Sequence, residues 1–450
     1  MSTIPHIAQD IHVVPSFTLE CGTQLKEAPV AYKTWGRLNR TRDNVMVICH
    51  ALTGSADVED WWGPLMGRNK AFDPSRFFIF CGNTLGSPYG TASPITTNPD
   101  TGRPYGPTFP PTTIRDDVNL HQHVLRTHLG VRQVAVVIGG SMGGMAALEW
   151  PLLAPPDFVR RIIVLATSAR HSAWCIAWGE SQRQSIYSDP AYKNGYYEIN
   201  EQPSSGLAAA RMCALLTYRS RDSFEHRFGR KVQVAKHKDT KVSLITPPAS
   251  PPLGAVDLHN DGHRNQRSLS MSSAGSEPAG LLPPRPPIFS AQSYLRYQGD
   301  KFISRFDANC YIHITRKMDT HDLARGRVEA PANGVDADAD ADTALAETLA
   351  RLPPRALVIS IQSDGLFTPP EQALLATHIP ESELVVIPSG EGHDGFLVEF
   401  EEINHSVLGY LQREFAALYE GPTEEVDGED DFAVKKESLF GEAEVDLTRW

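Results

Sequence analysis

The chain has no uninterrupted apolar run of about 18 residues, the length that a membrane-spanning helix requires. The segment from Met1 to Phe17 has neither a basic start followed by an apolar stretch nor an Arg-rich amphipathic pattern, so it does not resemble a targeting signal. We therefore expect a protein of the cytoplasm that has no membrane partner.

The sequence also has few basic residues. It carries 42 Lys and Arg against 54 Asp and Glu, a formal net charge of −12, and no long Lys/Arg run. Recognition of a phosphate backbone needs a concentrated basic face, so a nucleic-acid partner is disfavoured. Part of the negative charge lies in residues 424–431, within an acidic C-terminal tail that we place at residues 421–450 and interpret as solvated.

Cysteine is scarce and scattered. Its six positions include no CxxC pair and no His at metal-ligand spacing, so we expect reduced thiols and no metal. Cys49 and Cys81 lie in apolar runs and are interpreted as small core residues. With 41% hydrophobic and 21% charged residues, the composition is typical of a globular protein with a substantial core.

Short apolar runs alternate with helical patterns along much of the chain. A run that is apolar on both faces is typical of a strand in a buried parallel sheet, and βαβ alternation predicts a doubly wound α/β fold. A helix is predicted over Ile114–Leu129, ending at Gly130, and another over Glu401–Leu418. The predicted strands are Val45–Cys49, Phe77–Cys81, Val134–Ile138, Ile162–Ala166, Ala356–Ile361 and Leu384–Pro388.

The strand pattern is interrupted in the middle of the chain, which divides the α/β core. We assign residues 1–168 and 346–420 to the two parts of the core, and residues 169–345 to an inserted helical lid over the carboxyl edge of the sheet. Within the lid, residues 229–287 are rich in Ser, Pro and Gly and are predicted to be a disordered loop. Residues 333–343, NGVDADADADT, lack the Gly turn and final Glu of a calcium loop and are interpreted as a solvated linker.

One motif points to chemistry. Gly139-Gly140-Ser141-Met142-Gly143 follows the VAVVI strand directly and precedes a helical start. This is G-x-S-x-G in the strand–turn–helix context that exposes a nucleophilic serine. The alternatives, an incidental serine in a Gly-rich turn or a phosphate loop, fit less well, because the glycines do not match G-x-G-x-x-G and no Walker lysine follows. Ser141 is the candidate nucleophile.

A serine hydroxyl needs a base to take its proton and a third group to orient that base. In this fold the chain order is Ser, acid, His. Asp364 and His393 follow the last two predicted strands, in QSDGLF and EGHDGFL, where the sheet would present them toward Ser141. We predict that these three residues form a catalytic triad.

The tetrahedral intermediate of acyl transfer needs backbone N–H donors for its oxyanion. Met142, the residue after the nucleophile, should supply one donor. Leu52, in the CHALTG loop after an early strand, should supply the other, although that loop could also be an ordinary strand-to-helix turn.

Several longer motifs carry a family resemblance that covers most of the chain outside the inserted loop and the tail. They are similar to those of fungal homoserine O-acetyltransferases, a family with the α/β-hydrolase fold. The motifs are HALTGSA at His50, NTLGSPYGTASP at Asn83, GGSMGGMAALEW at Gly139, ATSARHSAWCIAWGESQRQSIYSDP at Ala166, FDANCY at Phe306 and EGHDGFL at Glu391.

This resemblance implies a ping-pong acyl transfer from acetyl-CoA to the hydroxyl of L-homoserine, with no metal or bound organic cofactor, and a product that feeds methionine biosynthesis. It assigns Arg211 to the substrate carboxylate and Asp394 to its ammonium group. Arg211 could instead be a lid-surface arginine, and Asp394 a loop-capping carboxylate. The family commonly dimerises through its lid, so a homodimer is expected.

Other activities share this machinery. A serine hydrolase would use the same triad with water as the acceptor, although an aromatic lid and a carboxylate-binding arginine favour transfer to an amino acid. Related acyltransferases use deacetylcephalosporin C or serine as acceptor, or succinyl-CoA as donor. A catalytically inactive interaction protein is disfavoured, because all three triad residues are present in the right order.

Overall fold

The computed structural model describes residues 4–232, 259–263, 288–327 and 337–421. In these residues, eight strands form one sheet in the order β1-β2-β4-β3-β7-β8-β9-β10. The strands are β1 (Asp10–Thr18), β2 (Gln24–Trp35), β3 (Val45–Cys49), β4 (Phe78–Gly82), β7 (Val134–Gly140), β8 (Val159–Leu165), β9 (Leu357–Ile361) and β10 (Glu383–Ile387).

All six predicted strands are present, and their ends differ from the predicted ends by at most three residues. From β4 to β10 every neighbouring pair is parallel, and the side chains of β3, β4, β7 and β9 are buried throughout. The register pairs Cys49 at the end of β3 with Gly139 near the end of β7, which brings the loops that follow these strands together. The prediction of a mostly parallel α/β fold is confirmed.

The hairpin of β1 and β2 was not predicted. Both strands run antiparallel to their neighbours at the edge of the sheet. Most side chains of β1 are exposed or half-buried, so the strand lacks the doubly apolar run that identified the central strands. The sequence signal for an edge strand is therefore weak.

Helices of the core connect the strands. The predicted helix at Ile114 begins with a capping box at Thr113, runs as α2 to His123, and continues through a π-helical turn to His128. The second predicted helix is interrupted at Phe415, which separates α14 from α15. The core helices are α1 (Val58–Trp62), α2 (Ile114–His123), α3 (Met142–Leu153), α12 (Pro369–His378), α13 (Gly395–Val398), α14 (Phe400–Glu414) and α15 (Ala416–Glu420).

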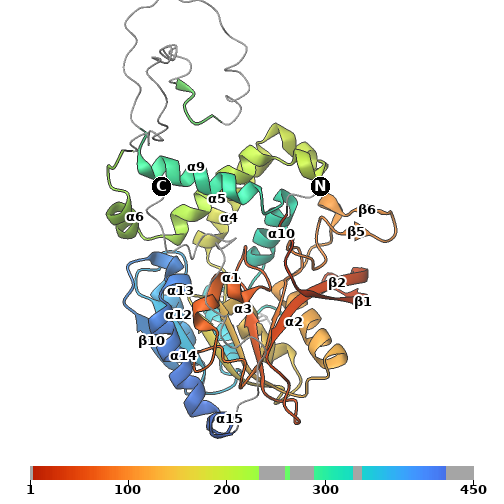
Figure 1. The fold of residues 1–450 in the computed structure, drawn as a ribbon, viewed down its shortest axis with the longest axis vertical. Helices are drawn as coiled ribbons and strands as arrows, with labels where there is room; N and C mark the ends of the chain where they lie inside the picture. The colour runs from red at the N-terminus through yellow and green to blue at the C-terminus, as the bar shows by residue number, and fades with distance from the viewer. Residues whose placement is uncertain (1–3, 233–258, 264–287, 328–336, 422–450) are drawn as a thin grey trace, which may run out of the picture.

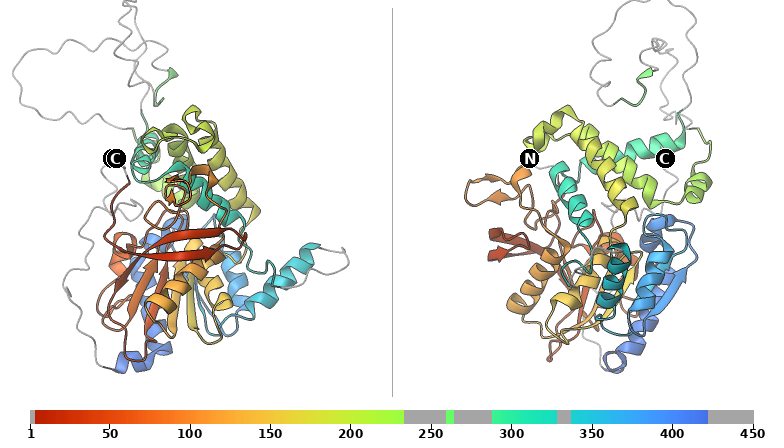
Figure 2. Two further views of the ribbon diagram at one scale, coloured as in Figure 1. Left: turned by 90° about the vertical axis from the view of Figure 1, so that its right-hand side faces the viewer. Right: turned by 180° about the vertical axis from the view of Figure 1, so that it is seen from behind.

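A second layer of helices interrupts the strand order between β8 and β9. Figures 1 and 2 show these helices stacked over one end of the sheet. Helix α5 packs against both α4 and α9, and α4 also packs against α10. The layer consists of α4 (Ala173–Tyr187), α5 (Ser204–Tyr218), α6 (Arg221–Arg227), α9 (Ser290–Ile303) and α10 (Ala308–Asp319). The position fits the predicted lid, whose limits in the sequence stay a prediction.

Two predictions for polar segments have different outcomes. The interpretation of residues 333–343 as a linker is wrong for the part that the structure describes, because α11 spans Ala337–Leu349. Ala has the highest helix propensity, and acidic residues stabilise the first turn of a helix. The predicted disordered loop at residues 229–287 lies mostly outside the described residues, as does the tail after residue 421. No helix in the described parts of the chain is long and apolar enough to cross a membrane.

A buried ion pair joins the helical layer to the core. The Lys317 ammonium group on α10 lies 2.7 Å from a carboxylate oxygen of Asp117 on α2, and both side chains are almost completely buried. Lys317 also donates to the Leu85 carbonyl, and the Leu85 N–H donates to Asp117. Burial lowers the pKa of Lys317 and raises the pKa of Asp117, while each charge opposes the shift of the other. Removing one partner would leave an uncompensated charge.

We expect Lys317→Met to lower the free energy of unfolding by about 3–5 kcal/mol, the usual cost of leaving one member of a buried pair alone. The double variant Lys317→Met/Asp117→Asn should recover most of the loss, because no buried charge remains. Lys26→Met, which removes an exposed ion pair with Asp100, is the control and should change little. Denaturant unfolding measures all three. A Lys317→Met variant as stable as the control would contradict this account.

Candidate active site

Ser141 lies at a sharp turn between β7 and α3. Its backbone has φ 57° and ψ −127°, a conformation that a residue with a Cβ rarely adopts. The neighbouring glycines permit the turn, because a Cβ at Gly139 would lie 2.1 Å from the Gly143 carbonyl oxygen, and one at Gly143 would lie 2.1 Å from the Cys49 carbonyl oxygen. Backbone from three segments therefore meets at this position, where no larger residue fits.

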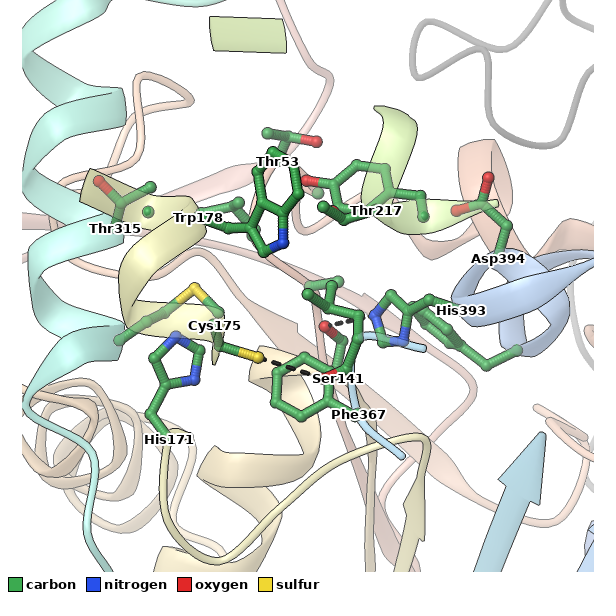
Figure 3. A pocket seen from close by; sticks show the side chains of 18 of the residues that line it. Thr53, Ser141, His171, Cys175, Trp178, Thr217, Thr315, Phe367, His393 and Asp394 are labelled. Carbon is green, nitrogen blue, oxygen red and sulfur yellow. Dashed lines mark hydrogen bonds between the residues drawn. The ribbon is translucent and has the colours of Figure 1, made fainter. Parts of the chain in front are cut away.

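The three predicted triad residues are hydrogen-bonded in sequence. His393 Nε2 lies 2.9 Å from Ser141 Oγ, and His393 Nδ1 lies 2.7 Å from Asp364 Oδ2. Figure 3 shows the His393 ring beside Ser141, with this contact drawn as a dashed line. All three side chains are at most 5% exposed. The geometry allows His393 to take the serine proton while Asp364 holds the Nδ1–H tautomer.

The loops after β9 and β10 fix the acid and the base. The second carboxylate oxygen of Asp364 accepts the backbone N–H groups of Leu366 and Phe367, at 2.8 and 2.9 Å. Because both oxygens of this carboxylate accept hydrogen bonds, three in all, its orientation is determined before any substrate binds. This preorganisation is what a base-orienting residue requires.

The two predicted oxyanion donors lie near the nucleophile. Met142 is the first residue of α3, and Leu52 lines the same cavity as Ser141. In the part of the chain that the structure describes, neither backbone N–H is used in a hydrogen bond. Both groups are therefore available to a developing oxyanion, as the prediction requires.

The cavity above Ser141 is lined by both layers of the protein. Core residues supply Ser141, His393 and the Leu52 loop, and the helices α4, α5 and α10 supply the opposite wall. Figure 3 shows Trp178, Thr217 and Thr315 across the cavity from the Ser141–His393 pair. Five aromatic side chains from both layers line the cavity, namely Trp61, Trp178, Tyr218, Phe367 and Phe396.

A cysteine and a second histidine also line this cavity, but neither is activated for catalysis. Burial raises the pKa of Cys175 to about 12, and its thiol donates to the Leu366 carbonyl. Burial lowers the pKa of His171 to about 3, so its ring is neutral at physiological pH. Neither has the activated nucleophile or base character of the Ser141–His393 pair.

Asp394, the predicted ammonium ligand, lines the cavity next to His393. Its carboxylate lies 2.8 Å from Nε of Arg219, and the same guanidinium contacts Glu391. Burial opposes the charge of Arg219, but the two carboxylates raise its pKa above the usual value. Arg219 ends helix α5, so it joins the helical layer to the loop that carries His393.

Arg211, the predicted carboxylate ligand, is almost completely buried on α5 and is not among the residues that line the cavity. Its guanidinium carbon lies 5.5 Å from the ring centre of Tyr218 and 5.1 Å from that of Phe302. Tyr218 does line the cavity. The structure thus places Arg211 behind the Tyr218 ring as seen from the cavity, and the role of Arg211 in binding stays a prediction.

The sequence prediction missed Tyr218 and Arg219. Both lie in the segment TYRS, where α5 ends at Tyr218 and Arg219 is the next residue. Arg219 binds carboxylates more than 170 positions later in the chain, so its partners become visible only in the fold. An arginine in a helical pattern gives no signal of such a contact.

The strained turn at Ser141 makes a prediction about stability. We expect the free energy of unfolding of Ser141→Gly to be about 1 kcal/mol higher than that of Ser141→Ala. The positive φ costs a residue with a Cβ roughly 1–2 kcal/mol, and the larger conformational entropy of glycine in the unfolded state offsets part of this gain. Both variants lack the nucleophile, so the comparison isolates the backbone. Denaturant unfolding tests it, and an equal or lower value for Ser141→Gly would show that the turn is unstrained.

Comparison with known proteins places this chain in a family. Residues 44–400 match the family model described as alpha/beta hydrolase fold. A homoserine O-acetyltransferase of Cryptococcus neoformans var. grubii is 56% identical, over 99% of this chain and 96% of that protein. The homoserine O-acetyltransferase of Saccharomyces cerevisiae is 49% identical, over 98% of this chain and 94% of that protein.

Solved structures share the fold at lower identity. A homoserine O-acetyltransferase from Bacillus anthracis superposes with a TM-score of 0.70 at 21% identity, covering 91% of this chain and 99% of that one. The acetyl esterase MekB superposes with a TM-score of 0.64 at 22% identity, covering 92% of this chain and 98% of that one. With curated relatives at this identity over nearly its whole length, the chain belongs to the homoserine O-acetyltransferase family of the α/β-hydrolase fold.

Proposed function

We propose that this protein is a homoserine O-acetyltransferase that transfers the acetyl group of acetyl-CoA to the hydroxyl of L-homoserine. The observation that carries the proposal is the match to homoserine O-acetyltransferases over nearly the full chain. The hydrogen-bonded Ser141, His393 and Asp364 supply the chemistry that such a transfer needs.

The first half-reaction forms an acetyl-enzyme. His393 Nε2 takes the proton of Ser141 as the serine oxygen attacks the thioester carbonyl of acetyl-CoA. The Leu52 and Met142 N–H groups stabilise the oxyanion of the tetrahedral intermediate. The intermediate collapses, the carbon–sulfur bond breaks, and the CoA thiolate leaves with the proton from His393.

The second half-reaction transfers the acetyl group. His393 takes the proton of the homoserine hydroxyl as its oxygen attacks the acetyl-enzyme, and then returns the proton to Ser141 as the serine ester bond breaks. Asp364 stabilises the imidazolium in both steps. Burial of Ser141 under the helical layer supports transfer over hydrolysis, because few water molecules reach the ester.

The charges of the cavity favour acetyl-CoA over succinyl-CoA. The residues known to line the cavity in the described part of the chain include no Lys or Arg, and its charged members are Asp319 and Asp394. The neutral His171 adds no positive charge. Asp319 and Asp394 are already paired with Arg183 and Arg219, so a succinyl carboxylate would find no Lys or Arg among the described residues that line the cavity.

The same charges suit an ammonium group. Asp394 lies beside His393 on the cavity wall, so a bound amino acid could pair with it while its hydroxyl reaches the base. Arg211 remains our proposed ligand for the carboxylate, which would have to approach it beside the Tyr218 ring.

A cytoplasmic location, a homodimer and supply of O-acetyl-L-homoserine for methionine biosynthesis also belong to this proposal.

The decisive experiment measures CoA release from acetyl-CoA and from succinyl-CoA, with homoserine, serine, deacetylcephalosporin C or water as the acceptor. We expect release that depends on acetyl-CoA and homoserine together, and an acetyl group trapped on the protein when the acceptor is omitted. Ser141→Ala should abolish both signals. Equal release with water alone would identify a hydrolase, and a preference for another acceptor or donor would reassign the substrate.

Asp394→Asn separates the two half-reactions. It keeps the shape of the side chain but removes the charge, so KM for homoserine should rise about 10- to 100-fold, the value of one charged hydrogen bond. Formation of the acetyl-enzyme from acetyl-CoA should keep its rate, since no amino acid takes part. Rapid-quench kinetics measures both steps. Asp322→Asn, which alters an ion pair with Arg170 away from the cavity, serves as the control.

A further inference from the structure

His50 lies at the start of the loop that carries Leu52, directly after β3. Its side chain is 1% exposed and makes two hydrogen bonds. The ring nitrogen Nε2 accepts the backbone N–H of Thr84 at 3.1 Å, and Nδ1 lies 2.8 Å from the carbonyl oxygen of Ala51. The triad does not use this histidine.

These partners determine the tautomer of His50. The Thr84 N–H is a donor, so Nε2 must be unprotonated, and the Ala51 carbonyl is an acceptor, so Nδ1 must carry the proton. Ala51 and Leu52 share one planar peptide unit, whose C=O and N–H point in opposite directions. The Ala51 carbonyl oxygen accepts hydrogen bonds from the His50 ring and from the Gly54 N–H, the latter at 2.9 Å. Because these bonds fix the orientation of the peptide unit, they also fix the direction of the Leu52 N–H.

A second histidine extends this chain of hydrogen bonds. His121 Nε2 lies 2.9 Å from the carbonyl oxygen of Asn83, so it carries the proton and donates. Asn83 and Thr84 also share one peptide unit, and its N–H is the group that His50 accepts. Four dipoles therefore follow head to tail, in the order His121, the Asn83–Thr84 peptide, His50 and the Ala51–Leu52 peptide.

We propose that His121 and His50 form a neutral hydrogen-bond relay that orients and polarises the Leu52 N–H toward the oxyanion. The inference rests on the proposed function of Leu52 as an oxyanion donor. Aligned hydrogen bonds strengthen one another in a low-dielectric interior. His50 is thus a positioning residue, since it acts on the reacting atoms only through the Leu52 peptide.

The surroundings keep the relay neutral. Burial lowers the pKa of His50 and of His121 to about 4. The charged neighbour of both rings is Lys317, which further lowers these pKa values and is itself paired with Asp117. A protonated His50 could not accept from Thr84, so neutrality is a condition for the arrangement.

Two substitutions of His50 separate its two hydrogen bonds. The amide of Asn lies the same number of bonds from Cα as Nδ1, so His50→Asn keeps a donor for the Ala51 carbonyl. The amide of Gln corresponds to Nε2, so His50→Gln keeps the contact with Thr84 and loses the one with Ala51. We expect His50→Gln to lower the rate of Ser141 acetylation by p-nitrophenyl acetate about 10- to 100-fold, a part of the loss caused by removing an oxyanion donor.

The other readouts distinguish positioning from a general structural role. His50→Asn should retain most of the acetylation rate, and KM for the ester should be the same in all variants. Affinity for methylboronic acid, whose adduct with Ser141 is tetrahedral and anionic, should fall in His50→Gln by the same factor as the rate. His313→Gln is the control, because His313 is another histidine whose pKa burial lowers, and it contacts Thr112 instead of the relay. Equal losses in both His50 variants, or a change in KM alone, would overturn the proposal.

The two tautomers can also be measured in the wild-type protein, so this test does not depend on whether a variant folds. Nitrogen-15 NMR of labelled histidine should show His50 as the neutral Nδ1–H tautomer and His121 as the neutral Nε2–H tautomer from pH 6 to 9. The opposite tautomer at either ring would break the relay and refute the inference. The ester and NMR experiments do not use homoserine, so their outcome is independent of whether the proposed acceptor is correct.

Discussion

The turn at Ser141 is the constraint on which the site depends. Its positive φ angle aims the serine hydroxyl out of the sheet, and the space for this turn exists only because glycines let β3, β7 and α3 approach at backbone distance. The same close approach places the loop after β3, with Leu52, next to the nucleophile. Ser141 and the proposed oxyanion donors are thus positioned by one packing arrangement, and the strain at Ser141 is balanced by the buried sheet around it.

The helical layer completes the site through charged contacts with the core. Lys317 binds Asp117, and Arg219 binds Asp394 and Glu391 beside His393. Buried ion pairs add little net stability, but their strict geometry selects one arrangement of the parts they join. The apolar walls of the cavity would tolerate small shifts of the layer, whereas these pairs would not. They therefore fix the distance between the helical wall of the cavity and His393.

The sequence predicted those features whose signal is local. Strands such as β3 and β7 were predictable because they are apolar on both faces, and Ser141 because its glycines are adjacent in the chain. Asp364 and His393 followed from their positions after strands. The edge hairpin of β1 and β2 lacked such a pattern, and α11 was hidden by a polar composition. The contacts of Arg219 and His50 were missed because their partners come from loops that meet in the fold, and residues adjacent in the sequence do not indicate them.

A comparison of two histidines shows how partners determine chemistry. His393 and His50 hold their proton on Nδ1, and each meets a donor at Nε2. At His393 the Nδ1 partner is a carboxylate and the Nε2 partner is a hydroxyl that can give up its proton, so the ring can become positively charged. At His50 the partners are a peptide carbonyl and a peptide N–H, which offer neither a counter-charge nor a transferable proton. The first ring is therefore suited to act as a base, and the second can only transmit orientation and polarity to the peptide beside it.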